Sequence, residues 1–122
     1  MAKTPQSKKA KGSKLEREVA KMLVDSGLDQ YATRMPLSGA IAGLKADIHT
    51  KLPLQIECKA QEVTKFQEWF RQAEEGKNIG DRKIPIVVWT KNRLDRKFCY
   101  LDFQDFINIL YYAMKGGLGD DT

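Results

Sequence analysis

Residues 84–89 constrain the fold more than any other segment of this chain. They read Ile-Pro-Ile-Val-Val-Trp, a nearly continuous apolar run without the polar alternation of a half-exposed strand. A strand of this kind is buried on both faces, as strands are in sheets that helices cover on both sides. The segment therefore predicts a central strand and a layered α/β domain around it.

The other segments supply the helices and strands that such a domain needs. Apolar residues at helical spacing between Ser13 and Gly27 predict a first helix, which the glycine ends. Two more helices are expected over residues 65–77 and from Asp102 to Gly116 and Gly117, and the strands over residues 30–35, 45–50, 53–60, 84–89 and 97–101. This α-β-β-β-α-β-β-α order predicts a central mixed β-sheet flanked by α-helices.

The charge of the chain is concentrated at its N-terminus. Residues 1–17 carry six basic side chains and one carboxylate, whereas the remaining 105 residues carry fifteen of each. Residues 1–11 have no apolar periodicity, so we expect a flexible basic arm followed by a single domain over residues 12–122. A basic arm favours a polyanionic partner such as nucleic acid. A solubilising tail and a weak nuclear-type signal are the alternatives.

The sequence lacks the features of a membrane protein, a secreted protein or a zinc-binding protein. No apolar run approaches the roughly 18–20 residues of a membrane span, and the N-terminus lacks the apolar core of a secretory signal. We therefore expect no membrane contact and a cytoplasmic location. Cys58 and Cys99 lie in expected strands and are predicted to be reduced and buried. No Cys-x-x-Cys pair or Cys/His cluster indicates a zinc site.

Glu57 and Lys59 are the first candidates for chemistry. They stand two positions apart in the strand expected over residues 53–60, so both side chains emerge on the same face. Asp47, ten residues before Glu57, supplies a second carboxylate from a neighbouring strand. Two carboxylates and an ammonium form a minimal Mg²⁺-dependent phosphodiesterase site. The other Glu-x-Lys string, at residues 75–77, has a helical context and no such neighbour.

Glu16 has two interpretations. The run from Ser13 to Glu16 has the form of a capping box, with the serine at the N-cap and the glutamate at the third helical position. From spacing alone this structural role is favoured. The same position also lies beside the apolar stripe that faces the sheet, where the carboxylate would approach the other acids.

Several short motifs follow one another along the chain. They are Lys-Gly-Ser-Lys-Leu-Glu-Arg-Glu at residues 11–18, Arg34, Ser38-Gly39, Lys45-Ala46-Asp47 and Ile56-Glu57-Cys58-Lys59. In this order they resemble the archaeal and phage-type Holliday junction resolvases of the PD-(D/E)xK nuclease superfamily, most closely the phage branch. The resemblance covers residues 11–101 and implies a restriction-endonuclease-like α/β core. Ala46 departs from it, since the superfamily nominally has a proline before the aspartate.

The resemblance also implies roles for the acidic residues and the lysine. Glu16, Asp47, Glu57 and Lys59 would be the catalytic residues. Asp47, Glu57 and the Cys58 carbonyl would hold Mg²⁺, for which Mn²⁺ would substitute, and Glu16 would be an outer or substrate-stage ligand. Lys59 would position or help to deprotonate the attacking water, or stabilise the pentavalent phosphate.

Basic and hydroxyl side chains complete the expected DNA surface. Arg17, Arg34 and Ser38 match positions that the family uses around the junction phosphates. Lys91 and Arg93 follow the central strand, where a solvated turn is an equally good interpretation. The expected DNA-binding residues are Lys11, Lys14, Arg17, Arg34, Ser38, Lys45, Lys91 and Arg93.

The last expected helix is apolar on almost every face. One helix of a small domain cannot bury all its faces within that domain, so part of this surface is expected to meet a partner. A four-way junction has approximate two-fold symmetry and must be cut in two opposed strands. A homodimer that pairs through this helix, with the helix over 65–77 as a second candidate, would match that symmetry.

These features predict a Mg²⁺-dependent, structure-selective DNA endonuclease, and the resemblance to the phage branch makes a phage a candidate source. The expected activity is that of a Holliday junction resolvase, which makes paired nicks in opposite strands of four-way junctions in DNA recombination and repair. One alternative is a related nuclease that nicks duplex, flap or other branched DNA. Others are a non-catalytic DNA-binding module on the same fold and a small interaction domain that binds no divalent cation.

Overall fold

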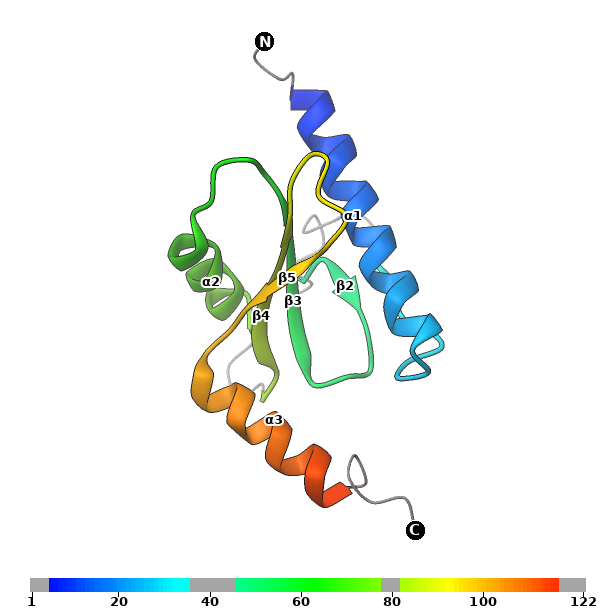
Figure 1. Ribbon diagram of the computed structural model, residues 1–122, viewed down its shortest axis with the longest axis vertical. Helices are drawn as coiled ribbons and strands as arrows, with labels where there is room; N and C mark the ends of the chain where they lie inside the picture. Colours follow the sequence, from blue (N-terminus) through cyan, green and yellow to red (C-terminus); the bar gives the residue numbers. More distant parts are fainter. Residues whose placement is uncertain (1–4, 36–45, 78–81, 117–122) are drawn as a thin grey trace.

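The computed structural model describes residues 5–35, 46–77 and 82–116, with side chains from Ala10 onward. Figure 1 shows the arrangement of its helices and strands. In chain order these are α1 (Pro5–Asp25), β1 (Thr33–Arg34), β2 (Ile48–His49), β3 (Leu54–Ala60), α2 (Phe66–Glu75), β4 (Ile84–Thr90), β5 (Phe98–Tyr100) and α3 (Phe103–Gly116). The order is the one that the sequence predicts.

Strands β3, β4 and β5 form a mixed sheet in that order. β3 is parallel to β4, and β4 is antiparallel to β5. α2 provides the crossover that a parallel β3–β4 pair requires. β1 and β2 form a separate antiparallel pair, and the Asp47 N–H donates to the Ile56 carbonyl at 3.0 Å, which joins this pair to β3. The predicted restriction-endonuclease-like α/β fold is therefore confirmed.

The central strand is buried as its sequence predicts. On one face of the sheet, Leu15 and Val19 of α1 pack against Ile56, Cys58 and Val88. Because alternate residues of a strand face opposite sides, the residues between them face α2. Figure 1 shows α1 and α2 on opposite sides of the sheet.

The α2 face is lined by aromatic side chains. Trp69 and Ala73 are the buried residues of α2. Phe66 meets Trp69 and Trp89 edge to face, with ring centroids 5.4 and 5.6 Å apart. The indole N–H of Trp89 donates to the Gln61 carbonyl at 2.8 Å, so its polar atom is satisfied.

α1 begins earlier than expected. Its predicted start at Ser13 is wrong, because the helix runs without a break from Pro5. Residues 5–11, expected as part of a flexible arm, are helical, and the expected domain boundary at residue 12 falls inside the helix. The lysines, glutamine and alanine of this segment are good helix formers, and proline suits the first helical position. The capping-box interpretation of Ser13 and Glu16 is therefore wrong.

Two other expectations are corrected. β1 and β2 have two residues each, not the six expected. Asp29 fixes the chain just before β1 and just after β2 in turns. Its buried carboxylate accepts hydrogen bonds from the Tyr31 N–H, the Thr50 hydroxyl and the Lys51 N–H. Cys99 is exposed, not buried, because β5 is an edge strand.

The described helices include none that is long and apolar enough to cross a membrane. α3 begins as predicted, since the Asp105 N–H donates to the carboxylate of Asp102 at 3.0 Å.

Candidate active site

Asp47 is fixed at the junction of the two groups of strands. It directly precedes β2, and its carbonyl accepts a hydrogen bond from the Met35 N–H at 2.8 Å. Its carboxylate accepts one from the Cys58 N–H at 2.7 Å, across the gap to β3. These contacts hold the Asp47 side chain beside the centre of β3, where Glu57 stands.

Asp47 and Glu57 form a directly hydrogen-bonded carboxyl pair. Burial, followed by the charge of Asp47, raises the pKa of Glu57 from its ordinary 4.5 to about 8. Burial also raises the pKa of Asp47, while the hydrogen bond from the Cys58 N–H opposes that rise. The raised pKa values of the two groups leave a proton on the pair near neutral pH.

Lys59 lies on the same face of β3 as Glu57, two residues further along the strand. Its positive charge lowers the pKa of both carboxyl groups, against the effect of burial. Glu57 and Lys59 are each half-buried, opposite Val87 and Trp89 of the parallel strand. The predicted cluster of two carboxylates and an ammonium is therefore assembled.

Glu16 lies close to this cluster but is engaged elsewhere. It is buried in α1, and its charge raises the pKa of both Asp47 and Glu57. Its carboxylate accepts a hydrogen bond from Arg34 Nε at 2.6 Å, while Arg34 Nη2 donates to the Ser13 hydroxyl at 2.9 Å. This contact across 18 residues replaces the expected capping box.

Cys58 contributes its backbone rather than its thiol. The side chain is buried against α1, and burial, followed by the charge of Asp47, raises the pKa of its thiol. A thiol in this environment stays protonated and inert. The backbone N–H, by contrast, orients Asp47.

The carboxyl pair has the chemistry that a hard divalent cation requires. In the described part of the chain, no three His, Cys, Asp or Glu side chains form a group that could hold a metal ion. Asp47 and Glu57 nevertheless supply desolvated oxygen donors that repel one another when both are ionised, and a bound cation removes that repulsion. The two residues therefore fit such a cation, with backbone carbonyl oxygens and water as further donors.

The expected DNA-binding residues fall into three groups. Arg17 is exposed on α1, and Arg34 is held by Glu16 and Ser13. Ser38 and Lys45 lie outside the described residues. The remaining four, Lys11, Lys14, Lys91 and Arg93, line one pocket between α1 and the loop that joins β4 to β5.

Two polar residues near the site were missed by sequence reasoning. Gln55 is buried in β3, two residues before Glu57, and its amide nitrogen has no hydrogen-bond partner among the described residues. The signal was a polar residue inside the apolar run of residues 52–56. Asp29 was missed because its three partners lie 2 to 22 residues away, and no local pattern marks it.

Comparison with known proteins places the chain in a family. A search of curated proteins and a search of solved structures found no match. A family model described as "Phage putative PDDEXK endonuclease" matches residues 7–115, a span that includes nearly all of α1, the carboxyl pair, Lys59 and nearly all of α3. The chain therefore belongs to this phage family of PD-(D/E)xK endonucleases.

Proposed function

We propose that the protein is a divalent-metal-dependent DNA endonuclease that resolves four-way junctions. The observation that carries the proposal is the buried Asp47–Glu57 pair with Lys59 beside it. Carboxylate oxygens are the donors that Mg²⁺ and Mn²⁺ take in proteins, so Asp47, Glu57 and the Cys58 carbonyl would hold the cation. When bound, a divalent cation neutralises charge on the phosphodiester and makes a bound water more acidic.

The residues around the pair have separate tasks in this proposal. Lys59 places a positive charge where negative charge develops on the phosphate, or orients the attacking water. The Cys58 N–H keeps Asp47 in position. Glu16, held by Arg34, adds negative potential that favours a cation at the pair.

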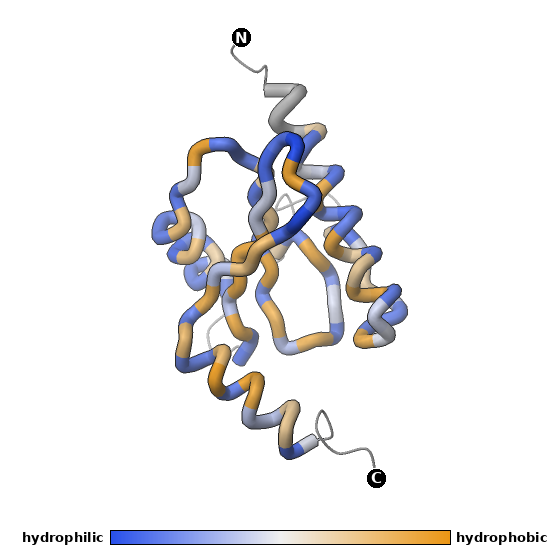
Figure 2. Tube along the Cα trace, viewed as in Figure 1, coloured by the Kyte–Doolittle hydropathy of each residue, from blue (hydrophilic) through white to orange (hydrophobic). Residues whose placement is uncertain are grey.

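We also propose that α3 pairs two copies of the chain. None of its side chains is buried. Six of its seven exposed large apolar residues follow spacings of three and four, which form a single stripe on a helix: they are Phe103, Phe106, Ile107, Leu110, Tyr111 and Met114. The seventh, Tyr112, lies outside this stripe. The half-buried residues Asp105, Ile109 and Ala113 form the opposite face. Figure 2 shows the concentration of hydrophobic residues along this helix.

The size and charge of the α3 stripe favour a second copy as its partner. Six side chains that are 41–74% exposed, at roughly 200 Å² each, offer about 650 Å². This approaches the roughly 800 Å² that each partner contributes to a standard interface. Asp105 is the single charged residue between Phe103 and Met114. Two copies of the stripe would therefore meet without like charges that repel one another. A two-fold dimer would present two sites to a junction.

Cleavage of a labelled immobile four-way junction, beside its linear duplex arms, tests the activity. We expect paired nicks in opposite strands with Mg²⁺, no nicks in EDTA, and a loss of about 10²-fold or more in rate for Asp47→Asn and Glu57→Gln. Glu74→Gln, at an exposed position of α2, is the matched control and should cut as the wild type does. Equal cutting of duplex and junction would keep the nuclease and reject the resolvase. Binding without cutting in Mg²⁺ or Mn²⁺ would favour a non-catalytic DNA-binding module.

Sedimentation of wild type and Leu110→Glu tests the dimer. A charge in the centre of the stripe should give a monomer without loss of the fold, because Leu110 is exposed within its own domain. Tyr112→Glu, at an exposed position outside the stripe, should leave the dimer intact. A monomeric wild type at micromolar concentration contradicts this proposal.

A further inference from the structure

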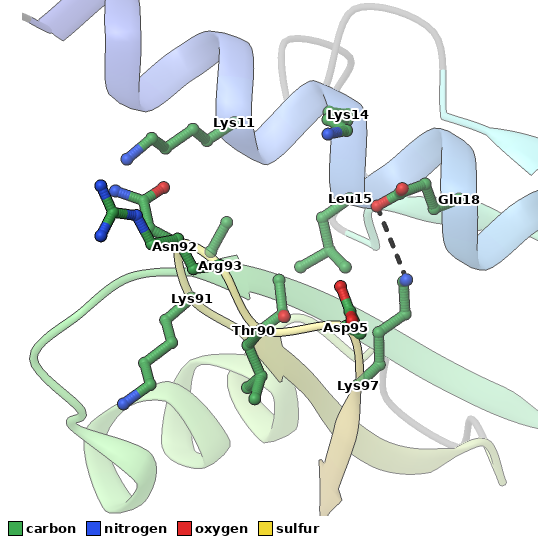
Figure 3. Close-up of a pocket in the computed structure, with 12 residues that line it drawn as sticks. Lys11, Lys14, Leu15, Glu18, Thr90, Lys91, Asn92, Arg93, Asp95 and Lys97 are labelled. Atoms are coloured by element: carbon green, nitrogen blue, oxygen red, sulfur yellow. Dashed lines mark ion pairs between the residues drawn. The ribbon is translucent and has the colours of Figure 1, made fainter.

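A pocket of about 360 Å³ lies between α1 and the loop that joins β4 to β5. Figure 1 shows these two segments side by side, although they are far apart in the sequence. In Figure 3, Lys11 and Leu15 extend from α1 towards the loop. The pocket is lined by Lys11, Lys14, Leu15, Glu18, Ala60, Thr90, Lys91, Asn92, Arg93, Leu94, Asp95 and Lys97.

Positive charge dominates the rim of this pocket. Five lysine and arginine residues line it, against the two carboxylates of Glu18 and Asp95. Glu18 forms an ion pair with Lys97 at 3.6 Å (Figure 3), so these two charges largely cancel. Lys14 and Arg93 are exposed, one on each wall. The remaining excess of cations favours an anionic occupant.

The floor of the pocket is apolar. Leu15 is 1% exposed, and Ala60 and Leu94 are half-buried beside it. An isolated phosphate or sulfate ion gains nothing from such a floor. A nucleotide does, because its sugar and base offer apolar surface next to the charged phosphate.

The loop wall is held in place by hydrogen bonds. The Thr90 hydroxyl donates to the Arg96 carbonyl at 2.9 Å, and the Asn92 N–H donates to the Glu62 carboxylate at 2.8 Å. Arg93 has a φ of 62°, a left-handed conformation that is unfavourable for a residue with a Cβ atom. The cations of the loop are thus placed before a ligand arrives, which lowers the entropic cost of binding.

The pocket adjoins the carboxyl pair along two elements. Ala60 directly follows Lys59 on β3, and Leu15 directly precedes Glu16 on α1. Glu57 and Ala60 are three residues apart, which is about 10 Å along a strand. The pocket therefore lies close enough to the carboxyl pair for one DNA molecule to reach both places.

We propose that this pocket binds the phosphodiester backbone of DNA close to the bond that the carboxyl pair addresses. The inference rests on the proposed nuclease function for the position of that bond. The binding itself depends on the charge and shape of the pocket. Lys14 and Arg93 contact the phosphate from opposite walls, and the half-buried Leu94 contacts the sugar.

Binding of a fluorescent four-way junction in EDTA tests the pocket without any cleavage. The variant combines Lys14→Gln with Arg93→Gly, since glycine accepts the left-handed conformation and should preserve the fold. We expect Kd to rise about tenfold and the slope of log Kd against log salt to fall by about two. Lys51→Gln, in the β2–β3 loop at the other end of the sheet (Figure 1), removes one charge and should change Kd less than about twofold.

A scan with single neutral methylphosphonates locates the contact. One substituted position should weaken binding of the wild type and have no further effect on the double variant, because both changes remove the same interaction. Equal Kd and equal salt slope for wild type and double variant would overturn the proposal, as would a wild type that binds no DNA. Wild-type binding that the double variant loses, with no cutting in Mg²⁺, would support the pocket and reject the nuclease function.

Discussion

At the scale of single residues, Asp47 and Glu57 are two carboxyl groups whose simultaneous ionisation is unfavourable. Asp47 and Glu57 are partly buried, hydrogen-bonded to one another and close to Glu16. Burial disfavours the charged form of each, and like charges add to that penalty. One proton therefore remains on the pair near neutral pH, and a cation can replace it.

Glu57 should make the metal-free protein less stable as the pH rises. Its pKa in the fold, about 8, lies above its ordinary 4.5, so the folded state holds the proton more tightly than the unfolded state. The stabilisation is complete below about pH 4.5 and is lost as the pH rises towards 8. Urea unfolding in EDTA at pH 5.5 and pH 8 should show Glu57→Gln losing about 2 kcal/mol less than wild type. Equal losses in both proteins would contradict the raised pKa.

Arg34 should have a structural role as well as any role in DNA binding. Its guanidinium satisfies Glu16, whose side chain is 9% exposed. Arg34→Ala leaves that carboxylate buried without its partner, which should lower the free energy of unfolding by about 1–3 kcal/mol. Arg71→Ala breaks an ion pair whose side chains are both more than 60% exposed, and should cost under about 0.5 kcal/mol. Similar values in denaturant titrations of the two variants would reject this role.

At the scale of secondary-structure elements, α1 is a longer helix than its sequence predicts. Gly12 lies in its interior, and a Cβ atom there would meet nothing within 4 Å. Gly27 follows the helix with a φ of 82°, a conformation that only glycine adopts at low cost. The two glycines therefore have opposite effects on the stability of the same element.

Substitution by alanine should separate these two glycines. Gly12→Ala should stabilise the protein by about 0.5–1 kcal/mol, because alanine favours the helix. Gly27→Ala should destabilise it by about 1 kcal/mol, because the left-handed conformation is then strained. Thermal unfolding of both variants measures the two signs. A Gly12→Ala variant that unfolds earlier than wild type would show that α1 does not extend through residue 12.

At the scale of the whole molecule, the site is assembled from α1, the segment before β2, and β3. Glu16 and Glu57 are 41 residues apart in the sequence and interact through their charges. A ligand that binds this assembled site binds only the folded state, so it stabilises the whole domain. The same holds for the α3 stripe if a second copy covers it.

Divalent cations should therefore raise the melting temperature. At concentrations well above Kd, Mg²⁺ or Mn²⁺ should raise Tm by about 5–10 °C, and EDTA should reverse the change. Asp47→Asn should abolish the increase, whereas Glu74→Gln should keep it. No shift with either cation in the wild type would count against a metal at the carboxyl pair.

Local patterns in the sequence predicted much of this architecture. The apolar run of residues 84–89, the Glu57–Lys59 spacing and the expected start of the last helix at Asp102 all depend on residues within one element, where local backbone geometry decides the outcome. These predictions are confirmed in β4, β3 and α3. The predicted start of α1 at Ser13 was wrong because residues with high helix propensity extend upstream of the first apolar residue.

Contacts between distant segments could not be inferred from such patterns. Arg34 with Glu16, Asp29 with Thr50, and the pocket between α1 and the β4–β5 loop join residues 18 to 86 positions apart. Periodicity states which face a side chain occupies, but not which element will pack against that face. The proton that Asp47 and Glu57 share also depends on this packing, because burial by the surrounding elements raises the pKa of both groups. The sequence alone therefore identified the residues of the site, whereas the packing of the folded chain determined their pKa values and protonation.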